Sequence, residues 1–393
     1  MTRKAWLAAI VPLVLLAALI AALVTLKPAE RLRPEGMPAV ERLRIERATL
    51  GQDGIRLSVM NDGPDPVTIA QVTVDDAYWA FTMEGSATLR HLGRTTVHVP
   101  YPWVQGEAHL VKLLTSTGTP FEHEIAVAVE TPRVTATHLA AFAMIGLYVG
   151  VLPVLLGLCW YPVLARLERA GLDAVIALTI GLLAFLLVDA TREGLEGASA
   201  LADSFQGTAM FTGATVAAFL GLEVLGQRLR AARASRVQDG RSDGAVLALL
   251  IAMGIGLHNF GEGLAIGAAF ALGEAALGTL LIVGFTLHNT TEGLAILAPV
   301  AKERPPLRWL IELGLIGGVP TIAGAWFGGF VSSPAVAVLC LGLGAGAIAQ
   351  VLYQLARQIA GARPLVERFA TVPVMSGLAA GFMVMYATGM LVG

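Results

Sequence analysis

The chain has 393 residues, of which 55% are hydrophobic and only 14% are charged. Soluble domains carry about 25% charged residues, so this composition excludes an ordinary soluble protein and predicts a multi-span protein with the lipid bilayer as a partner. The formal net charge of −2 implies no nucleic-acid partner. Cys159 and Cys340 lie in apolar runs without metal-binding spacing, and we interpret both as small buried hydrophobic residues.

The first apolar run extends from Ala5 to Leu26 and has about the length that spans a bilayer. Arg3 and Lys4 precede it, and no small-residue cleavage site follows it. Its apolar core is longer than that of a secretory signal peptide. We therefore predict an uncleaved transmembrane anchor over residues 1–28.

The segment 29–133 has a different pattern, in which apolar and polar residues alternate with a period of two. Examples are 67–74 and 95–99, and turn-forming residues such as those at 61–66 separate such stretches. Short strands with turns every 8–12 residues are typical of β-sandwiches. The sequence predicts an all-β, immunoglobulin-like domain here, without a disulfide because the segment contains no cysteine.

The remainder, residues 134–393, contains eight apolar segments of membrane-spanning length, which predict an all-α bundle. We place these spans at 138–160, 172–190, 207–226, 245–271, 275–298, 308–330, 335–356 and 373–392.

The loops between these spans alternate in charge. Those after the first, third, fifth and seventh spans are basic and hold Arg166, Arg169, Arg228, Arg230, Arg233, Arg236, Arg241, Lys302, Arg304, Arg308, Arg357, Arg363 and Arg368, whereas the others hold only Arg192. The positive-inside rule places the basic loops and the chain's N-terminus in the cytoplasm. We therefore expect a cell-membrane (plasma or inner membrane) protein whose β-domain is extracytoplasmic.

One motif occurs twice, at Leu257–Ile266 and at Leu287–Ile296, with eight of ten positions identical. Both copies read His-Asn-x-x-Glu-Gly and lie inside predicted spans, where polar side chains are costly and are usually functional. On a helix, the His and the Glu share one face, and the Asn lies three residues from the Glu. The candidate metal ligands are His258, Asn259, Glu262, His288, Asn289 and Glu292.

The two copies should meet near the middle of the bilayer. Only Leu272–Glu274 connects the fourth and fifth spans, so these helices must pack as an antiparallel hairpin. The Glu of one copy then lies beside the His of the other, which predicts a site for a divalent cation. Glycines in and near the motifs are expected to let helices approach or kink: Gly261, Gly263, Gly267 and Gly293.

Three further acidic residues lie near span ends. Asp189 and Glu193 could form an acidic entrance that attracts cations, or simply a solvated helix end. Glu223 lies close to Arg228 and Arg230, and we interpret it as part of an interfacial charge pair.

Residues 138–393 resemble the ZIP (Zrt/Irt-like) family of divalent metal transporters. The shared features are eight spans, a charged loop after the third span, and the paired motif in spans four and five. The resemblance implies metal import towards the cytoplasm by alternating access. It also implies His258, Glu262 and Glu292 as central ligands and Asn259, His288 and Asn289 as flanking ones.

The chain departs from the family pattern at several points. Gly261 and Thr291 stand where the family often has proline before the motif's Glu. The span-six region Gly317–Pro320 lacks the acidic residue that accompanies a second metal in bacterial relatives, so we expect one metal per chain. The loop from Arg228 to Gly244 contains no histidine, and the anchor and β-domain lie outside the family pattern.

The sequence thus predicts a transporter of divalent cations rather than an enzyme, with Zn²⁺ as the first candidate cargo and Fe²⁺, Mn²⁺, Co²⁺ and Cd²⁺ left open. One alternative is an intramembrane metal-dependent hydrolase, although neither His-Glu-x-x-His nor a serine nucleophile motif is present. Another is a metal-responsive sensor whose β-domain binds an unknown partner. A homodimer is compatible with the sequence, which does not decide the oligomeric state.

Overall fold

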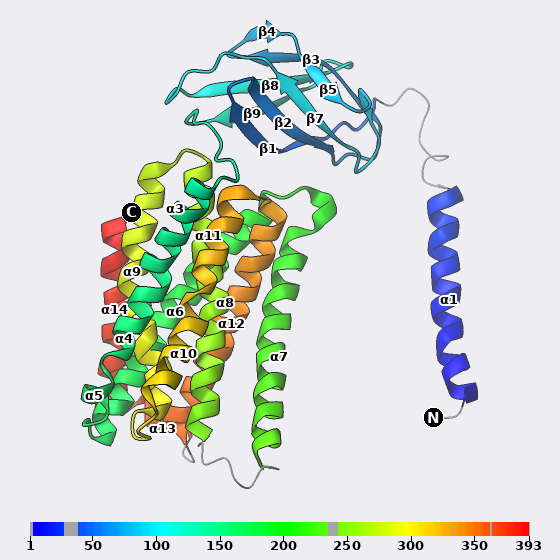
Figure 1. Cartoon of the computed structure of the whole chain (residues 1–393). Helices are drawn as coiled ribbons and strands as arrows, with labels where there is room; N and C mark the ends of the chain where they lie inside the picture. Colours follow the sequence, from blue (N-terminus) through cyan, green and yellow to red (C-terminus); the bar gives the residue numbers. More distant parts are fainter. Residues whose placement is uncertain (1–2, 27–37, 235–242, 332, 362–363, 393) are drawn as a thin grey trace.

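The computed structural model describes residues 3–26, 38–234, 243–331, 333–361 and 364–392. Figure 1 shows a β-domain stacked on one end of a helical bundle. The predicted N-terminal span is a helix, α1 (Arg3–Leu26), while its predicted end at residue 28 lies outside the described residues. Arg236, Arg241 and Arg363, used above for orientation, also lie outside them.

The β-domain consists of two antiparallel sheets. Its strands are β1 (Leu43–Gly51), β2 (Gly54–Asn61), β3 (Val67–Val74), β4 (Ala77–Trp79), β5 (Thr82–Glu84), β6 (Thr88–Leu89), β7 (Arg94–Val99), β8 (His109–Thr115) and β9 (Pro120–Ile125). One sheet has the order β1-β2-β7-β5 and the other β4-β3-β8-β9, with β6 paired to β3. Alternate residues from both sheets, such as Leu57 and Val111, are fully buried in one shared core. The period-two pattern therefore predicted the strands correctly.

A hydrogen-bonded polar cluster around Asp75 fixes the turn between β3 and β4. Asp75 and Asp76 both have positive φ, as the tight hairpin turns favoured by Asp and Asn require. The Asp75 carboxylate accepts hydrogen bonds from Leu110 N (2.8 Å), His109 Nδ1 (2.8 Å) and Tyr101 Oη (2.9 Å). Burial by itself would raise the pKa of Asp75, but these hydrogen bonds outweigh it and lower the pKa.

Asp75→Asn is expected to destabilise the β-domain at neutral pH and to remove part of its sensitivity to acid. A carboxylate with a lowered pKa contributes stability above its unfolded-state pKa, and that stability is lost as the pH falls through the folded-state pKa. Hydrogen exchange of β3 and β8 in the full-length protein, corrected for intrinsic rates, measures this effect. Asp76→Asn is the matched control, because Asp76 forms only an exposed ion pair with Lys112. Equal effects of both variants would contradict this role of Asp75.

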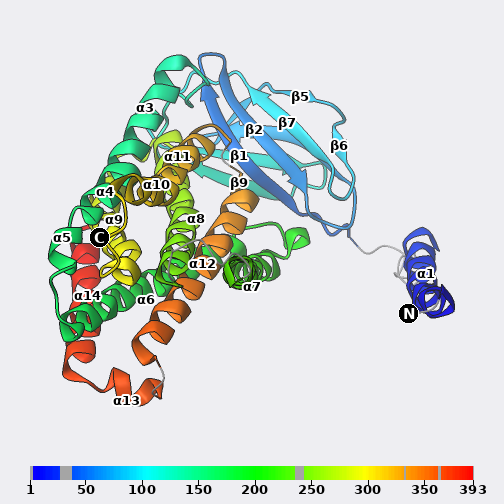
Figure 2. The same ribbon diagram turned by 60° about the horizontal axis from the view of Figure 1, so that its bottom comes forward.

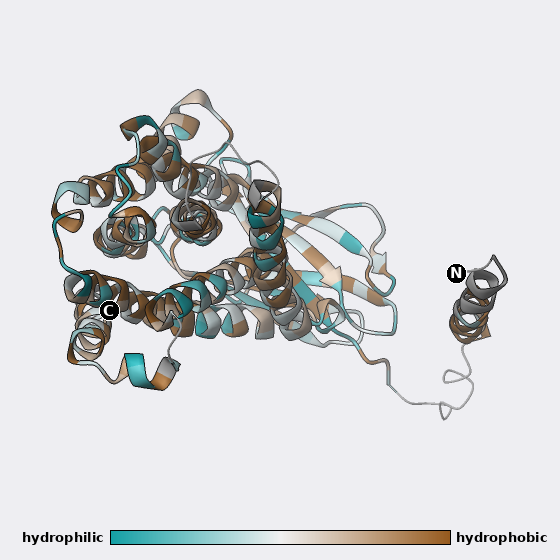
Figure 3. Ribbon diagram, turned by 90° about the horizontal axis from the view of Figure 1, so that it is seen from below, coloured by the Kyte–Doolittle hydropathy of each residue, from teal (hydrophilic) through white to brown (hydrophobic). Residues whose placement is uncertain are grey.

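Eight helical segments in the described part of the chain are long and apolar enough to cross a membrane. They are Ala136–Leu164, Arg169–Ser199, Asp203–Ala232, Gly244–Ala271, Ala275–Val300, Leu307–Phe330, Pro334–Ala360 and Val372–Met390. Each contains most of one predicted span. Hydrophobic residues cover much of these helices in Figure 3, and large ones such as Val188 and Met383 are exposed. A helix that is hydrophobic all round either lies in the core of a large protein or spans a membrane. Because large hydrophobic side chains are exposed on these helices, the structure indicates a multi-pass membrane protein.

The helical elements are α3 (Ala136–Gly146), the π-helical turn η1 (Leu147–Val151), α4 (Leu152–Leu158), α5 (Tyr161–Leu164), α6 (Arg169–Ser199), the 3-10 turn η2 (Asp203–Phe205), α7 (Gly207–Ala234), α8 (Asp243–Ala271), α9 (Ala275–Leu297), the 3-10 turn η3 (Ala298–Val300), α10 (Leu307–Gly318), α11 (Pro320–Phe330), α12 (Pro334–Ala360), α13 (Leu365–Phe369) and α14 (Val372–Val392). Thus η1 interrupts the first span, and the sixth is divided at Val319.

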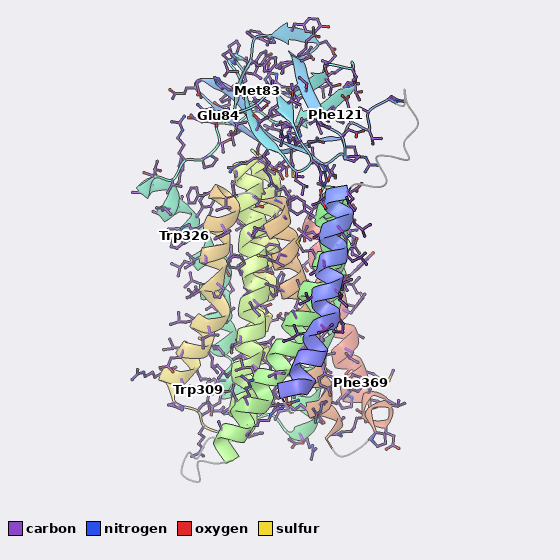
Figure 4. All side chains as sticks on the ribbon, turned by 90° about the vertical axis from the view of Figure 1, so that its right-hand side faces the viewer. Met83, Glu84, Phe121, Trp309, Trp326 and Phe369 are labelled. Atoms are coloured by element: carbon purple, nitrogen blue, oxygen red, sulfur yellow. The ribbon has the colours of Figure 1, made fainter. Side chains whose placement is uncertain are left out.

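Figure 4 shows Trp326 and Trp309 towards opposite ends of the α10–α11 span, as expected for residues at the two membrane interfaces.

Glycines bring the helices of the centre close together. A Cβ atom on Gly263 of α8 would lie 2.1 Å from Thr321 O of α11, and one on Gly293 of α9 would lie 2.3 Å from Val154 O of α4. Gly267 is equally tight against Ala325 O. Three of the four glycines selected from the sequence therefore allow close approach, as predicted. Gly261 does not, since a Cβ there would meet nothing within 4 Å.

The β-domain contacts the bundle through the connection between α6 and α7 (Figure 2). The Asp62 carboxylate accepts hydrogen bonds from the backbone N–H groups of Asp203 (2.7 Å) and Ser204 (3.1 Å), at the start of η2. Arg42 Nη1 lies 2.5 Å from Asp203 Oδ2, and Arg44 Nη2 donates to Leu201 O. These contacts satisfy donors that a helix start leaves free, and they fix the β-domain over this end of the bundle.

Candidate metal centre

Three predicted ligands meet in the interior of the bundle. His258 and Glu262 lie one turn apart on α8, and His288 lies on α9. Glu262 Oε1 is 2.5 Å from His288 Nε2 and 3.2 Å from His258 Nε2. All three residues are buried, and one ligand atom from each lies within 4.8 Å of the others. The expected proximity of the Glu of one copy and the His of the other is found for Glu262 and His288.

The two asparagines connect the motif copies reciprocally. Asn289 Nδ2 donates to Glu262 Oε2 (2.9 Å), and Asn259 Nδ2 donates to Glu292 Oε2 (3.0 Å). Each amide also donates to a backbone carbonyl, Val149 O for Asn289 (3.0 Å) and Gly317 O for Asn259 (3.1 Å). Each amide nitrogen thus has two acceptors, which supports the assignment of its orientation.

Interruptions of the first and sixth spans supply these two carbonyls. Pro153 has no N–H, so it cannot donate to Val149 O, four residues earlier. Gly317 lies in the last turn of α10, where carbonyls lack intrahelical partners. The irregular helices therefore turn two backbone acceptors towards the centre, and these orient the asparagines.

Several buried atoms of this centre have lone pairs but no hydrogen-bond partner among the described residues: Asn259 Oδ1, Asn289 Oδ1, Glu292 Oε1 and His258 Nε2. His258 Nε2 is within ion-pair distance of Glu262, but the pair is not aligned as a hydrogen bond. Burying an unpaired polar group is costly. Oxygen and nitrogen lone pairs that converge without donors are the chemistry that suits a cation.

Neither a family model nor a curated protein matches this chain. The assignment of the centre therefore depends on its geometry and on the residue types described above.

The structure separates the six candidate ligands into two groups. The resemblance implied His258, Glu262 and Glu292 as the central set, but the structure gathers His258, Glu262 and His288. Glu292 is buried and hydrogen-bonded to Asn259. Among the described residues, Glu292 Oε1 has no hydrogen-bond partner, so Glu292 offers a further ligand atom.

Asp189 and Glu193, for which an acidic entrance and a solvated helix end were both open, lie near the centre. Both line a cavity of about 40 Å³ together with His258 and Glu262. Gly261 and Cys340 line the same cavity. Sequence reasoning missed Cys340, because a single cysteine on a distant helix gives no spacing signal.

The interpretation of Glu223 as an ion pair with Arg228 or Arg230 is not what the structure shows. Glu223 accepts hydrogen bonds from the side-chain amides of Gln227, Gln350 (3.4 Å) and Gln354 (2.8 Å), and Arg230 donates to Gln354 Oε1. Gln350 and Gln354 are buried on α12. Neutral glutamines satisfy this carboxylate because α12 packs against α7, a contact that the local sequence does not reveal.

Span six brings a backbone carbonyl to the centre in place of a carboxylate. Gly317 O contacts Asn259 Nδ2, whereas Glu312, the acidic residue of α10, pairs with Arg308 at 3.0 Å near the start of that helix. The Glu312 side chain is half exposed. Glu312 is therefore not part of the centre, whose carboxylates are Glu262 and Glu292 of the repeated motif.

Proposed function

We propose that this protein transports divalent metal ions across a membrane, as a transporter of the ZIP type. The observation that carries the proposal is the buried group of His258, Glu262 and His288 within a bundle of eight membrane-spanning helices. Its setting includes three oxygens, on Asn259, Asn289 and Glu292, that find no hydrogen-bond partner in the part of the chain that the structure describes. A buried centre of this kind in a membrane bundle is better suited to passing an ion than to catalysis.

Each part of the centre has a separate task in this proposal. Glu262 and Glu292 supply two negative charges to neutralise a dehydrated dication. His258 and His288, as neutral imidazoles, supply nitrogen ligands. Asn259 and Asn289 hold the two carboxylates in place through Nδ2 and offer Oδ1 as neutral ligands. Two imidazoles with a carboxylate favour Zn²⁺, and Fe²⁺, Mn²⁺, Co²⁺ and Cd²⁺ are the competitors.

The orientation in the membrane is part of the proposal. Basic loops at the end of the bundle away from the β-domain would face the cytoplasm, and import towards them would follow. The β-domain, which we propose to be immunoglobulin-like, would then lie outside the cytoplasm, over the entrance for metal. Accessibility of a tag inserted in the β9–α3 connection of intact cells tests this orientation.

Metal uptake into liposomes containing the purified full-length protein tests the function. We expect time-dependent Zn²⁺ accumulation that stops when His258 and His288 are both replaced by alanine. A panel of competing metals then ranks the cargo. A well-folded protein that binds Zn²⁺ but never accumulates it in liposomes would overturn transport and favour a sensor.

One metal ion is expected between α8 and α9. Glu262 and Glu292 balance one dication, and span six adds only the neutral carbonyl of Gly317, so a second dication beside the first would be poorly compensated. Anomalous diffraction from crystals grown with Zn²⁺ should show a single strong peak between these helices. Two strong peaks there would contradict the charge argument.

A further inference from the structure

A small cavity adjoins the metal centre on the side of the β-domain. Its volume is about 40 Å³, and side chains of α6, α8, α9 and α12 line it. Five of the lining residues are potential metal ligands: Asp189, Glu193, His258, Glu262 and Cys340. His258 and Glu262 belong to the centre, whereas the other three have no role in it.

Glu193 and Cys340 lie at a similar depth in the bundle, and Asp189 lies about one turn of α6 deeper. Glu193 is eight residues before Leu201, whose carbonyl contacts the β-domain, which corresponds to about 12 Å along a helix. Cys340 is six residues after Pro334, which lies at the same end of the bundle, or about 9 Å. One turn further along α12, a Cβ on Gly344 would lie 3.4 Å from His258 Cα. The cavity therefore lies between the β-domain end and the centre.

The chemistry of the cavity walls is that of a cation site. Asp189 and Glu193 are one turn apart on α6 and bring two carboxylates into an apolar span, where charge is costly. Cys340 is a free and partly exposed thiol. His258 is about nine-tenths buried, and its Nε2 has no hydrogen-bond partner among the described residues. A solvated helix end would explain the two acids but not the thiol that lines the same cavity beside His258.

We propose that Asp189, Glu193 and Cys340 form a loading site that holds the metal ion before it reaches His258 and Glu262. The inference rests on the proposed transport function and adds a substrate class to it. A sulfur ligand selects Zn²⁺ and Cd²⁺ over Mg²⁺, Ca²⁺ and Mn²⁺. When the ion binds, Cys340 loses its proton to water and one sulfur–metal bond forms, with no change of oxidation state.

The side chains must adjust for an ion to bind there. Within the described part of the chain, only the group of His258, Glu262 and His288 already has three ligand atoms within 4.8 Å. Asp189 and Glu193 are exposed, so their carboxylates are free to turn towards the thiol. A site whose ligands come together only when the ion is present suits brief loading better than storage.

Cadmium titration of the purified full-length protein tests the loading site, because a thiolate bound to Cd²⁺ gives a charge-transfer band in the ultraviolet. The chain has two cysteines, so the Cys159→Ala variant leaves Cys340 as the only thiol. Cys159 is exposed, and Cys159→Ser is a second variant if the first folds poorly. We expect the band in the Cys159 variant and its absence when Cys340→Ser is added.

Replacing a carboxylate of the loading site should weaken this band. In the Cys159→Ala background, Glu193→Gln should raise the Cd²⁺ concentration at half-saturation by about tenfold or more, as is typical when a supporting group of a metal site is lost. Glu196→Gln is the matched control, since Glu196 is on the same helix and pairs with Arg192 instead. The absence of a band with Cys340 alone, or equal effects of the two substitutions, would overturn the proposal.

The outcome of the cadmium titration can be distinguished from the outcome of the transport assay. A Cys340-dependent band in a protein that moves no metal in liposomes would leave the loading site standing and remove the transport function. Metal uptake by a protein without the band would do the reverse. In a protein that shows both, Cys340→Ser should reduce Cd²⁺ uptake more than Mn²⁺ uptake.

Discussion

Replacing Glu262 by glutamine is expected to abolish metal uptake, with a loss of more than about 100-fold, because removing one partner from a buried charged group costs about 3–5 kcal/mol. Glu262 is the residue on which the centre converges. Its Oε1 lies against both histidines, and its Oε2 accepts the Asn289 amide. Glutamine keeps the shape but removes the negative charge and turns one ligand oxygen into a donor.

Initial rates of Zn²⁺ uptake into liposomes, at matched protein content, measure this loss. Glu312→Gln is the control, since Glu312 is also a carboxylate in a span but is half exposed and paired with Arg308. Its uptake should match the wild type, and both variants should elute as the wild type does in size-exclusion chromatography. Uptake by Glu262→Gln near the wild-type rate would remove this residue from the ion's path.

The positions of the eight candidate spans were predictable because they depend on local properties of the sequence. An apolar run of about 20 residues spans a bilayer whatever its neighbours are, so the eight segments could be located from hydropathy alone. The meeting of Glu262 with His288 followed from the helical repeat and from the short connection at Leu272–Glu274, which leaves only an antiparallel hairpin.

The contacts that orient the centre could not be predicted in the same way. Asn289 meets Val149 O because α4 and η1 pack against α9. Glu223 meets Gln350 and Gln354 from more than a hundred residues away. Such partners depend on helix packing, and a single sequence contains no periodicity that reports it.

The position of Cys340 on the cavity could not be predicted from the sequence either. Its sequence context is apolar, which favoured a buried hydrophobic role, and only the placement of α12 beside α6 and α8 brings the thiol to a cavity shared with acids and an imidazole.

Glycines are more informative, because a glycine within an apolar helix already indicates close approach. Even so, the sequence could not separate Gly263, which packs tightly, from Gly261, which does not.

That difference predicts opposite outcomes for substitutions at two glycines that are only two residues apart on α8. Gly263→Ala is expected to lower the melting temperature by about 2 °C or more, because overpacking a well-filled interior costs about 1–3 kcal/mol. A Cβ on Gly263 would lie 2.1 Å from Thr321 O and 2.9 Å from Ala325 N, both of which are backbone atoms that cannot rotate away.

Gly261→Ala is the matched control on the same helix. Nothing lies within 4 Å of its added Cβ, so the better helix propensity of alanine should leave the melting temperature unchanged or raise it by the equivalent of up to about 1 kcal/mol. Thermal unfolding of the purified protein in detergent compares the two variants directly. Gly324 of α11 offers a reciprocal check, because its Cβ would lie 2.0 Å from Phe260 O and its replacement should resemble that of Gly263. Equal melting temperatures for the Gly261 and Gly263 variants would mean that α8 and α11 do not pack through this contact, and the position of Gly317 O at the metal centre would then lose its support.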